Sequence, residues 1–505
     1  MRAHWSVVVS VLGLSAMVTA SVVIVSAGSQ PGRAETVAQK AAPPTPVLSG
    51  QLPHLVPVPP GGLTPEQERP WFDTFSWQEF IALNWPAVAN KRGVADQPNN
   101  PQTFKAAFKP NDQGVYPTVV WGTWKQAYEL FEQGSQRPTP WDSFQAVLPC
   151  PNPSGNPPLT FLDDTPNDMN QALSNPLIDQ QLLYTRYEIR FNEAEYNTIR
   201  GQDNTPTSWL YIMTNLNAAL PITFPISDAG NYGAIELKAA WKPITASDDK
   251  KRYYIVNALV LDPSTNTCSN QQMGLVGFHI GHKTSPFTEW VWSTFEHIDN
   301  VSGSNPSFNN GTPNPPTPNG FDLATPVYPP VIAPATRKAV QVTRVNAIPT
   351  TPPSFSTVDL NASFQQLVAG TVWENYQLIA TQWPTAPQNF NRHGTYPQDC
   401  GSPFPQDGVA NTTAETYFQT LGSGLNSCMN CHYQVADTDF SWVLSLRAQQ
   451  QAAPHATPLS GAVRIGAVRG MDRFPRPADP AQDKARYLRE AIAKLRSAQA
   501  KIKTR

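Results

Sequence analysis

The sequence predicts an α+β fold: a β-rich, mostly antiparallel body with flanking helices, followed by a mainly α-helical C-terminal region. Three observations predict it. Strand-like runs separated by turn residues fill the middle of the chain, between residues 182 and 292. Segments with a helical apolar face lie on both sides of these runs, and helical patterns continue towards the C-terminus. The chain has 505 residues, 40% of them hydrophobic, which suffices for two or three domains.

Two helices are expected before the strands, and the ordered part is expected to begin near Trp71. Ser76 and Glu79 form a capping-box pattern for a helix over residues 77–83, which Pro86 would end. A second helix is predicted over residues 121–131.

The strands of the body are predicted from alternating apolar residues and flanking turns at residues 184–189, 234–241, 253–261 and 274–280. Residues 305–334 are rich in Pro, Asn and Gly, which predicts an irregular segment. A long helix is expected over residues 363–383, ended by Pro384.

The N-terminus carries an apolar stretch, residues 5–27, that ends in the small residues Val25-Ser26-Ala27. This pattern predicts an export signal, although the stretch is also long enough to remain as a membrane anchor. In both cases the body would be periplasmic or otherwise exported. The Pro/Ala-rich composition of residues 28–70 predicts a linker. The body would then occupy residues 71–400 and the C-terminal region residues 401–505.

The pentapeptide Cys428-Met429-Asn430-Cys431-His432 has the spacing of a c-type haem attachment site. Two thiols three positions apart can bond the two vinyl groups on one porphyrin edge, and the adjacent histidine can ligate the iron. The sequence therefore predicts one covalent haem c, held by Cys428 and Cys431, with His432 as the proximal iron ligand. The predicted export agrees, because haem c is attached outside the cytoplasm.

Other uses of the two cysteines fit less well. A zinc ribbon needs a second ligand pair at matching spacing, which the chain lacks, and a redox pair should follow a strand in a βαβ unit. A disulfide between them is the remaining alternative. Three further cysteines, Cys150, Cys268 and Cys400, allow one disulfide with three pairings, and the sequence does not choose among them.

The region around the pentapeptide has helical patterns of its own. Thr412 and Glu415 form a capping-box pattern for a short helix that leads to Cys428, and an amphipathic helix is expected over residues 480–503. This order resembles a small class I cytochrome c domain over residues 401–505. The resemblance implies an axial methionine in the following loop, and Met471 is the candidate for the sixth ligand.

The whole chain is also similar to large, exported, single-haem bacterial proteins of the cytochrome c family. The matching stretches are residues 77–86 (WQEFIALNWP), 233–241 (GAIELKAAW), 278–300 and 411–432. The resemblance implies that the haem region and the β-rich body form one functional unit.

Histidines of the body are the competing candidates for the far side of the iron. His279 and His282 lie in a predicted strand, where a separation of three residues places their side chains on opposite faces. His297 lies among aromatic and acidic residues and is an alternative distal residue. For all three, a structural role at the sheet is the competing interpretation.

Two functions follow. The first is electron transfer by an exported c-type cytochrome with a redox partner protein. The second is a haem-dependent oxidoreductase, peroxidase- or oxygenase-like, with a small-molecule substrate in a pocket between body and haem. A net charge of −2 gives no electrostatic basis for nucleic acid binding, and the chain has no GxGxxG after a strand, Walker loop, HExxH or GxSxG motif.

Overall fold

The structure is a computed structural model, and it describes residues 42–131, 138–144, 160–163, 169, 176–201, 222–262, 267–312, 337–387, 402–419 and 426–444. The predicted signal (residues 5–27), Met471 and the predicted helix 480–503 lie outside these residues. The described residues from Pro43 onward belong to one compact unit. Within the described part of the chain, no helix is long and apolar enough to cross a membrane.

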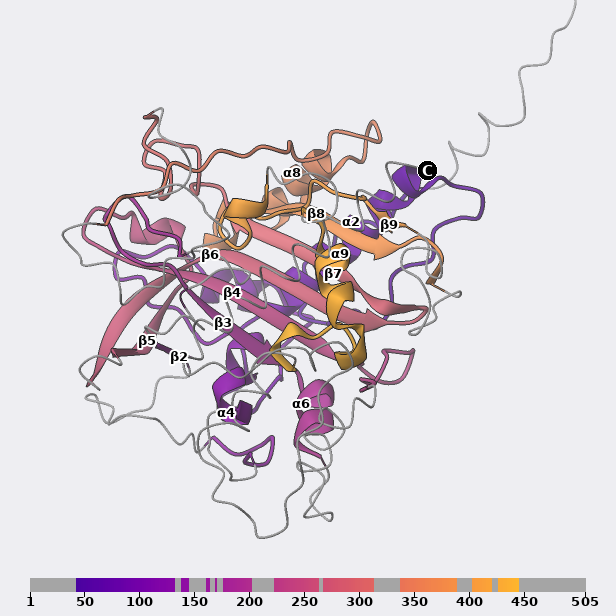
Figure 1. The fold of residues 1–505 in the computed structure, drawn as a ribbon, viewed down its shortest axis with the longest axis horizontal. Coiled ribbons are helices and arrows are strands. Elements are labelled where there is room, and N and C mark those ends of the chain that lie inside the picture. Colours follow the sequence, from indigo (N-terminus) through magenta and orange to yellow (C-terminus); the bar gives the residue numbers. More distant parts are fainter. Residues whose placement is uncertain are drawn as a thin grey trace, which may run out of the picture. The chain divides into compact units, whose positions relative to one another are not determined.

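A large, mostly antiparallel sheet is the centre of the fold, as predicted (Figure 1). Its described strands are β1 (Lys125–Gln126), β2 (Thr160–Asp163), β3 (Arg186–Phe191), β4 (Ile235–Pro243), β5 (Ile255–Asp262), β6 (Thr267–Thr284), β7 (Phe287–His297), β8 (Tyr376–Pro384) and β9 (Pro403–Phe404). The strand order is β1-β3-β4-β6-β7-β8-β9, and β5 pairs with the first half of the long strand β6. The pairing of β2 with β5 is parallel.

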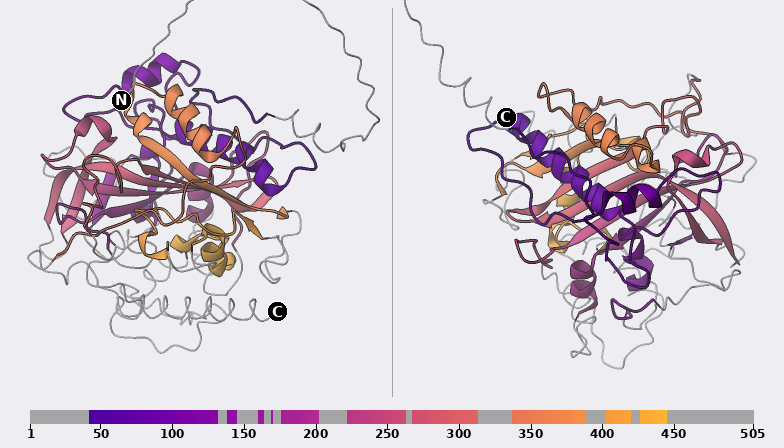
Figure 2. Two further views of the ribbon diagram at one scale, coloured as in Figure 1. Left: turned by 90° about the horizontal axis from the view of Figure 1, so that it is seen from above. Right: turned by 180° about the vertical axis from the view of Figure 1, so that it is seen from behind.

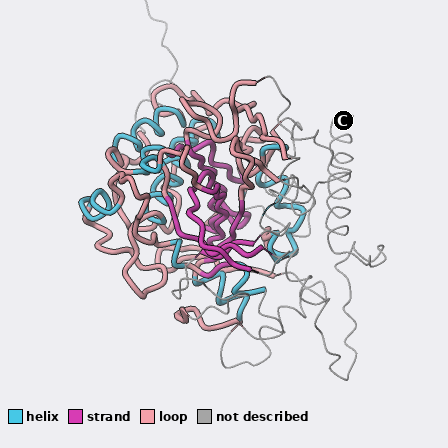
Figure 3. The backbone as a smooth tube through the Cα atoms, turned by 90° about the vertical axis from the view of Figure 1, so that its left-hand side faces the viewer, coloured by secondary structure: helices cyan, strands magenta, loops and turns pink. Residues whose placement is uncertain are grey.

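Helices lie on both faces of the sheet. The described helices are α2 (Pro65–Leu83), α3 (Pro101–Ala107), α4 (Ala127–Phe131), α6 (Glu193–Arg200), α8 (Thr357–Leu367) and α9 (Cys428–His432). Helices α2 and α8 contact each other and strand β8, and Figure 2 shows them on one side of the sheet with α9 on the other. Figure 3 shows the strands between these helical layers.

Helix α2 is packed against the sheet and against α8 through large buried side chains. Its fully buried Trp77 stacks against Phe364 of α8 and contacts Phe295 of β7, and its indole N–H donates to Asn361 Oδ1 at 2.8 Å. Burying an aromatic side chain of this size stabilises a fold by about 2–3 kcal/mol. The apolar side of α2 therefore anchors the sheet.

The predicted start of this helix was wrong. Helix α2 begins at Pro65, where Thr64 and Gln67 form its capping box, and residues 42–64 before it already bury Leu48 and Val56. Ser76 lies inside the helix, where its hydroxyl contacts Ser293 Oγ and Thr381 Oγ1, both at 2.7 Å. The sequence pattern that resembles a cap is thus a buried polar link to the sheet.

Three further expectations need correction. The predicted helix over residues 363–383 is helix α8 followed by strand β8, because Gly370 has a φ of +80° and ends the helical path. The predicted helix over residues 121–131 is a 3₁₀ turn η1 (Trp121–Thr123), the short strand β1 and helix α4. The helix expected from Thr412 is a turn that ends in the 3₁₀ helix η8 (Thr416–Phe418).

Candidate haem site

The pentapeptide forms the one-turn helix α9 against the face of the sheet opposite α2. Ser427 caps its N-terminus by accepting from the N–H of Asn430 at 3.3 Å, and Met429 is buried in the core. Gln382 of β8 fixes the turn, because its Oε1 accepts from the N–H of Met429 at 2.8 Å and its amide contacts Ser427 Oγ at 3.1 Å. The sheet thus holds a helix that is too short to be stable alone.

The two thiols are unpaired. Cys428 and Cys431 are free cysteines, and both are partly exposed. Burial raises the pKa of Cys431 to about 12 and that of Cys428 further, and Glu415 adds to both effects. A redox or nucleophilic cysteine needs a lowered pKa. These thiols therefore do not match an activated redox pair, whereas thioether formation uses them as free thiols.

His432 is oriented as an iron ligand would be. Its Nδ1–H donates to the carbonyl of Phe440 at 2.6 Å, and its Nε2 has no hydrogen-bond partner among the described residues. The ring centroid of Trp292 lies 4.1 Å from that of the imidazole. Burial lowers the pKa of His432 to about 4, so the imidazole is neutral. A neutral ring with one nitrogen bound to a carbonyl and the other available is the usual state of a metal-ligating histidine.

The sheet in front of the pentapeptide carries a row of polar side chains. Lys238 on β4, His279 on β6 and Thr294 on β7 are directly paired across the sheet, and residues paired in this way point to the same face. The adjacent row contains Gly281 and Trp292, and a Cβ on Gly281 would lie 3.0 Å from the Trp292 ring. The missing side chain of Gly281 gives the indole room beneath His432.

A turn from the segment before the pentapeptide closes the other side of this row. Thr413 lies over Gly277, where a Cβ would approach Thr413 Oγ1 to 2.4 Å, so this position accepts no side chain without a shift. Asn411 donates to the carbonyl of Phe295 at 2.7 Å. Glu415 then faces the sheet, and its Oε2 lies 3.2 Å from Nε2 of His279.

Charge in this row is partly balanced. Burial raises the pKa of Glu415, but His279 and Lys238 outweigh it, so the net pKa is lowered. Burial lowers the pKa of Lys238, against the opposing effect of Glu415. The side chains of His279 and Glu415 keep 19% and 22% exposure on a face that is otherwise largely buried. The residues present fit a haem: two free thiols, a neutral imidazole and a partly exposed polar surface lie together.

The other histidines lie elsewhere. His282 points to the opposite face from His279, as predicted, where it contacts Glu79 and Ser227 Oγ. The order of Ser227, His282 and Glu79 is that of a hydrolytic triad, but all three side chains are fully buried, so no substrate could reach the hydroxyl. Ser227, His282 and Glu79 therefore have a structural role in the buried core.

His297 is not brought to the pentapeptide. It stacks on Tyr253 with a centroid distance of 4.2 Å, its Nε2–H donates to the carbonyl of Arg252, and its Nδ1 accepts from the N–H of Asp299. Burial lowers its pKa to about 4. With both ring nitrogens in use, His297 has a structural role here.

Of the three remaining cysteines, Cys268 is disulfide-bonded. Cys150 and Cys400 lie outside the described residues.

Sequence reasoning missed Lys238, Glu415 and Trp292 as parts of the site. The alternation in residues 234–241 places Lys238 on the face opposite Leu237, but nothing local identifies which face the pentapeptide would cover. Strand pairing across long sequence distances brings these residues together.

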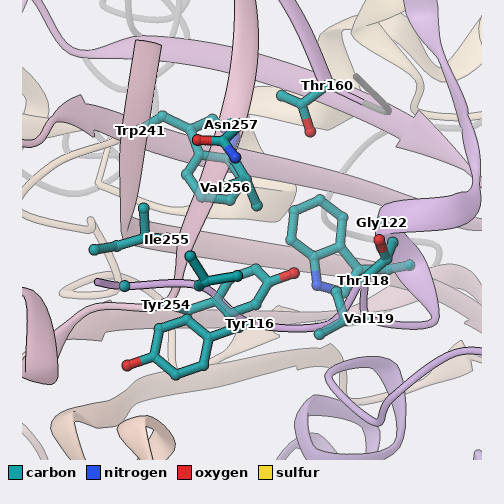
Figure 4. A pocket seen from close by; sticks show the side chains of 13 residues that line it. Tyr116, Thr118, Val119, Gly122, Thr160, Trp241, Tyr254, Ile255, Val256 and Asn257 are labelled. Carbon is teal, nitrogen blue, oxygen red and sulfur yellow. The ribbon is translucent and has the colours of Figure 1, made fainter. Parts of the chain in front are cut away.

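A separate pocket of about 200 Å³ lies among aromatic side chains (Figure 4). Tyr116, Trp121, Trp241 and Tyr254 line it, and no residue of the pentapeptide does. Within the described ranges, no group of three or more His, Cys, Asp and Glu is arranged to hold a metal ion.

The chain was compared with protein-family models, with curated proteins and with solved structures, and none of the three comparisons found a match.

Proposed function

We propose that Cys428 and Cys431 attach one haem c, that His432 ligates its iron, and that the exported protein transfers electrons to or from a redox partner protein. One observation carries the proposal: the imidazole of His432 donates to a backbone carbonyl through Nδ1 and leaves Nε2 available beside two free thiols. The haem would supply one-electron iron chemistry.

The residues of the chain would orient the ligand and shield it. The Phe440 carbonyl fixes which nitrogen faces the iron, and Trp292 covers one face of the imidazole. Met471 remains our candidate for the sixth ligand. Export, with residues 5–27 as signal or anchor, is part of the same proposal.

The test is the optical spectrum of the full-length protein, made in cells that attach haem c and recorded oxidised and reduced, with and without carbon monoxide. Electron transfer predicts a covalently bound, low-spin haem that ignores carbon monoxide, and a methionine-to-iron band that Met471→Ala abolishes. Protein without covalent haem would refute the attachment. A high-spin haem that binds carbon monoxide would refute the simple carrier.

A second candidate function is supported by the pair His279–Glu415. An imidazole next to a carboxylate on the surface facing the pentapeptide has the composition of an acid/base pair, so a haem-dependent oxidoreductase acting on a small molecule is the alternative. For that function, His279→Gln would abolish peroxide-dependent oxidation of a phenol and leave haem content unchanged. Glu374→Gln, a change outside this surface, is the control.

A further inference from the structure

The carbonyl that holds His432 belongs to an unusual piece of backbone. Asp439 and Phe440 have φ values of +52° and +70°, the left-handed region that side chains other than Gly, Asn and Asp rarely adopt. Among the described non-glycine residues with positive φ, two are aromatic, Phe440 and Trp290, and Trp290 stacks on Trp292 beneath His432. A bulky residue in this region costs about 1–3 kcal/mol. Surrounding contacts must therefore hold the turn.

Asp439 provides those contacts. Its Oδ2 accepts from Lys283 Nζ and from the backbone N–H of Phe224 at 2.6 Å. Asp439 is fully buried and Lys283 is 3% exposed.

Lys283 is itself fixed by the sheet, because its N–H donates to the carbonyl of Ala234 and its own carbonyl accepts from the N–H of Ser227. The ion pair thus ties the strained turn to strand β6. Among the described residues, no hydrogen bond or ion pair joins either side chain of the pair to His432.

We propose that the Lys283–Asp439 ion pair is a positioning device that sets the hydrogen bond from His432 to the Phe440 carbonyl and, through it, the reduction potential of the haem. The inference rests on the proposed function, since it needs haem on His432. A hydrogen bond at Nδ1 makes the imidazole a more basic ligand, which favours ferric over ferrous iron. A loosened turn weakens this bond and makes the potential more positive.

The direction of the shift separates positioning from charge. Removal of the Lys283 ammonium takes a positive charge away from the haem, which by Coulomb's law favours ferric iron and lowers the potential. If a neighbouring carboxyl takes up a proton and so restores the net charge, the potential stays unchanged. In neither case does the loss of charge raise the potential. Loss of the positioning role, by contrast, raises the reduction potential.

The first experiment is a redox titration of the full-length haem protein with Lys283→Met. We expect a more positive potential, with the ratio of reduced to oxidised protein at a fixed ambient potential raised about threefold or more, and altered g values of the ferric haem in electron paramagnetic resonance. The matched control is Lys242→Met, which removes the ammonium of another buried pair, Lys242–Asp248. It should lower stability and leave the potential and the g values unchanged.

A second experiment compares Asp439→Asn with Asp439→Ala, which change the charge equally. Asparagine tolerates the left-handed backbone and can still accept from the Phe224 N–H. The reduction potential of Asp439→Asn should therefore change only by the amount that the loss of the charge causes. The reduction potential of the Asp439→Ala variant should be still more positive. Its ratio of reduced to oxidised protein at a fixed ambient potential should exceed that of Asp439→Asn by a further threefold or more. If Lys283→Met does not fold, this comparison decides alone.

A potential that is unchanged or lower in Lys283→Met, or equal in the two Asp439 variants, overturns the positioning role while the proposed function stands. Wild-type protein without covalent haem overturns the proposed function itself, which is visible before any variant is measured.

Discussion

Glu289 is a buried carboxyl whose ionisation should make the stability of the protein depend on pH. Its carboxyl is fully buried at the start of β7, where Oε2 accepts from the Thr288 hydroxyl at 3.1 Å and Oε1 has no hydrogen-bond partner among the described residues. Burial raises its pKa from 4.5 to about 7. Folding therefore favours the protonated form.

The sign of the pH dependence follows from this shift. Because the folded pKa lies above the unfolded pKa, the contribution of Glu289 to stability is fully present below about pH 4.5 and is lost as the pH rises through about 7. At about 1.4 kcal/mol per pKa unit, the loss amounts to about 3 kcal/mol. Glu289→Gln carries no titrating group, so its stability relative to wild type should rise by about 2–3 kcal/mol between pH 5 and pH 8.

The assay is urea denaturation followed by tryptophan fluorescence across this pH range. Thr288→Ala is the control, since it keeps the carboxyl and removes a bond that lowers the pKa; it should retain the pH-dependent loss and extend it to higher pH. Stability curves of Glu289→Gln and wild type that run parallel from pH 5 to pH 8 would refute the reasoning.

Two further predictions concern the packing around the pentapeptide, and a third concerns the proposed attachment of haem. Gly277→Ala should cost about 1–2 kcal/mol in urea denaturation, as a clash with Thr413 Oγ1 exceeds the entropic gain of alanine; the double variant with Thr413→Ala should lose no more than Thr413→Ala alone. Tyr187→Phe removes a 2.6 Å bond to the buried Thr413 carbonyl and should cost about 1–3 kcal/mol in the same assay, whereas an unchanged midpoint would contradict this. Replacing Cys428 and Cys431 together with Ser should make all haem extractable by acidified organic solvent, whereas each single change should leave haem bound through one thioether, as a mass spectrum can check.

Local patterns predicted those parts of the fold that depend on local chemistry. Because side chains alternate along a strand, the separation of three residues predicted that His279 and His282 lie on opposite faces, and the predicted strands of the body fall within a few residues of β3 to β6. The predicted antiparallel sheet with flanking helices is present among the described residues.

Long-range pairing accounts for most of what the sequence did not reveal. Residues 376–384 have apolar spacing compatible with a helix, yet they pair with β7 from Trp292 to His297 and form a strand. Strand β7 itself was not predicted, and with it the position of Trp292 under His432 was missed. The contact of Glu415 with His279 depends on the same sheet register, which no local pattern encodes.

The dependence of the pentapeptide on Gln382 affects how the protein can be divided. Helix α9 spans five residues and takes its position from Gln382 of β8 and from the face of β7. A fragment that starts at residue 401 would contain the whole attachment motif but none of these supports. We therefore expect that the C-terminal region, excised or grafted onto another protein, will not fold around its attachment motif on its own.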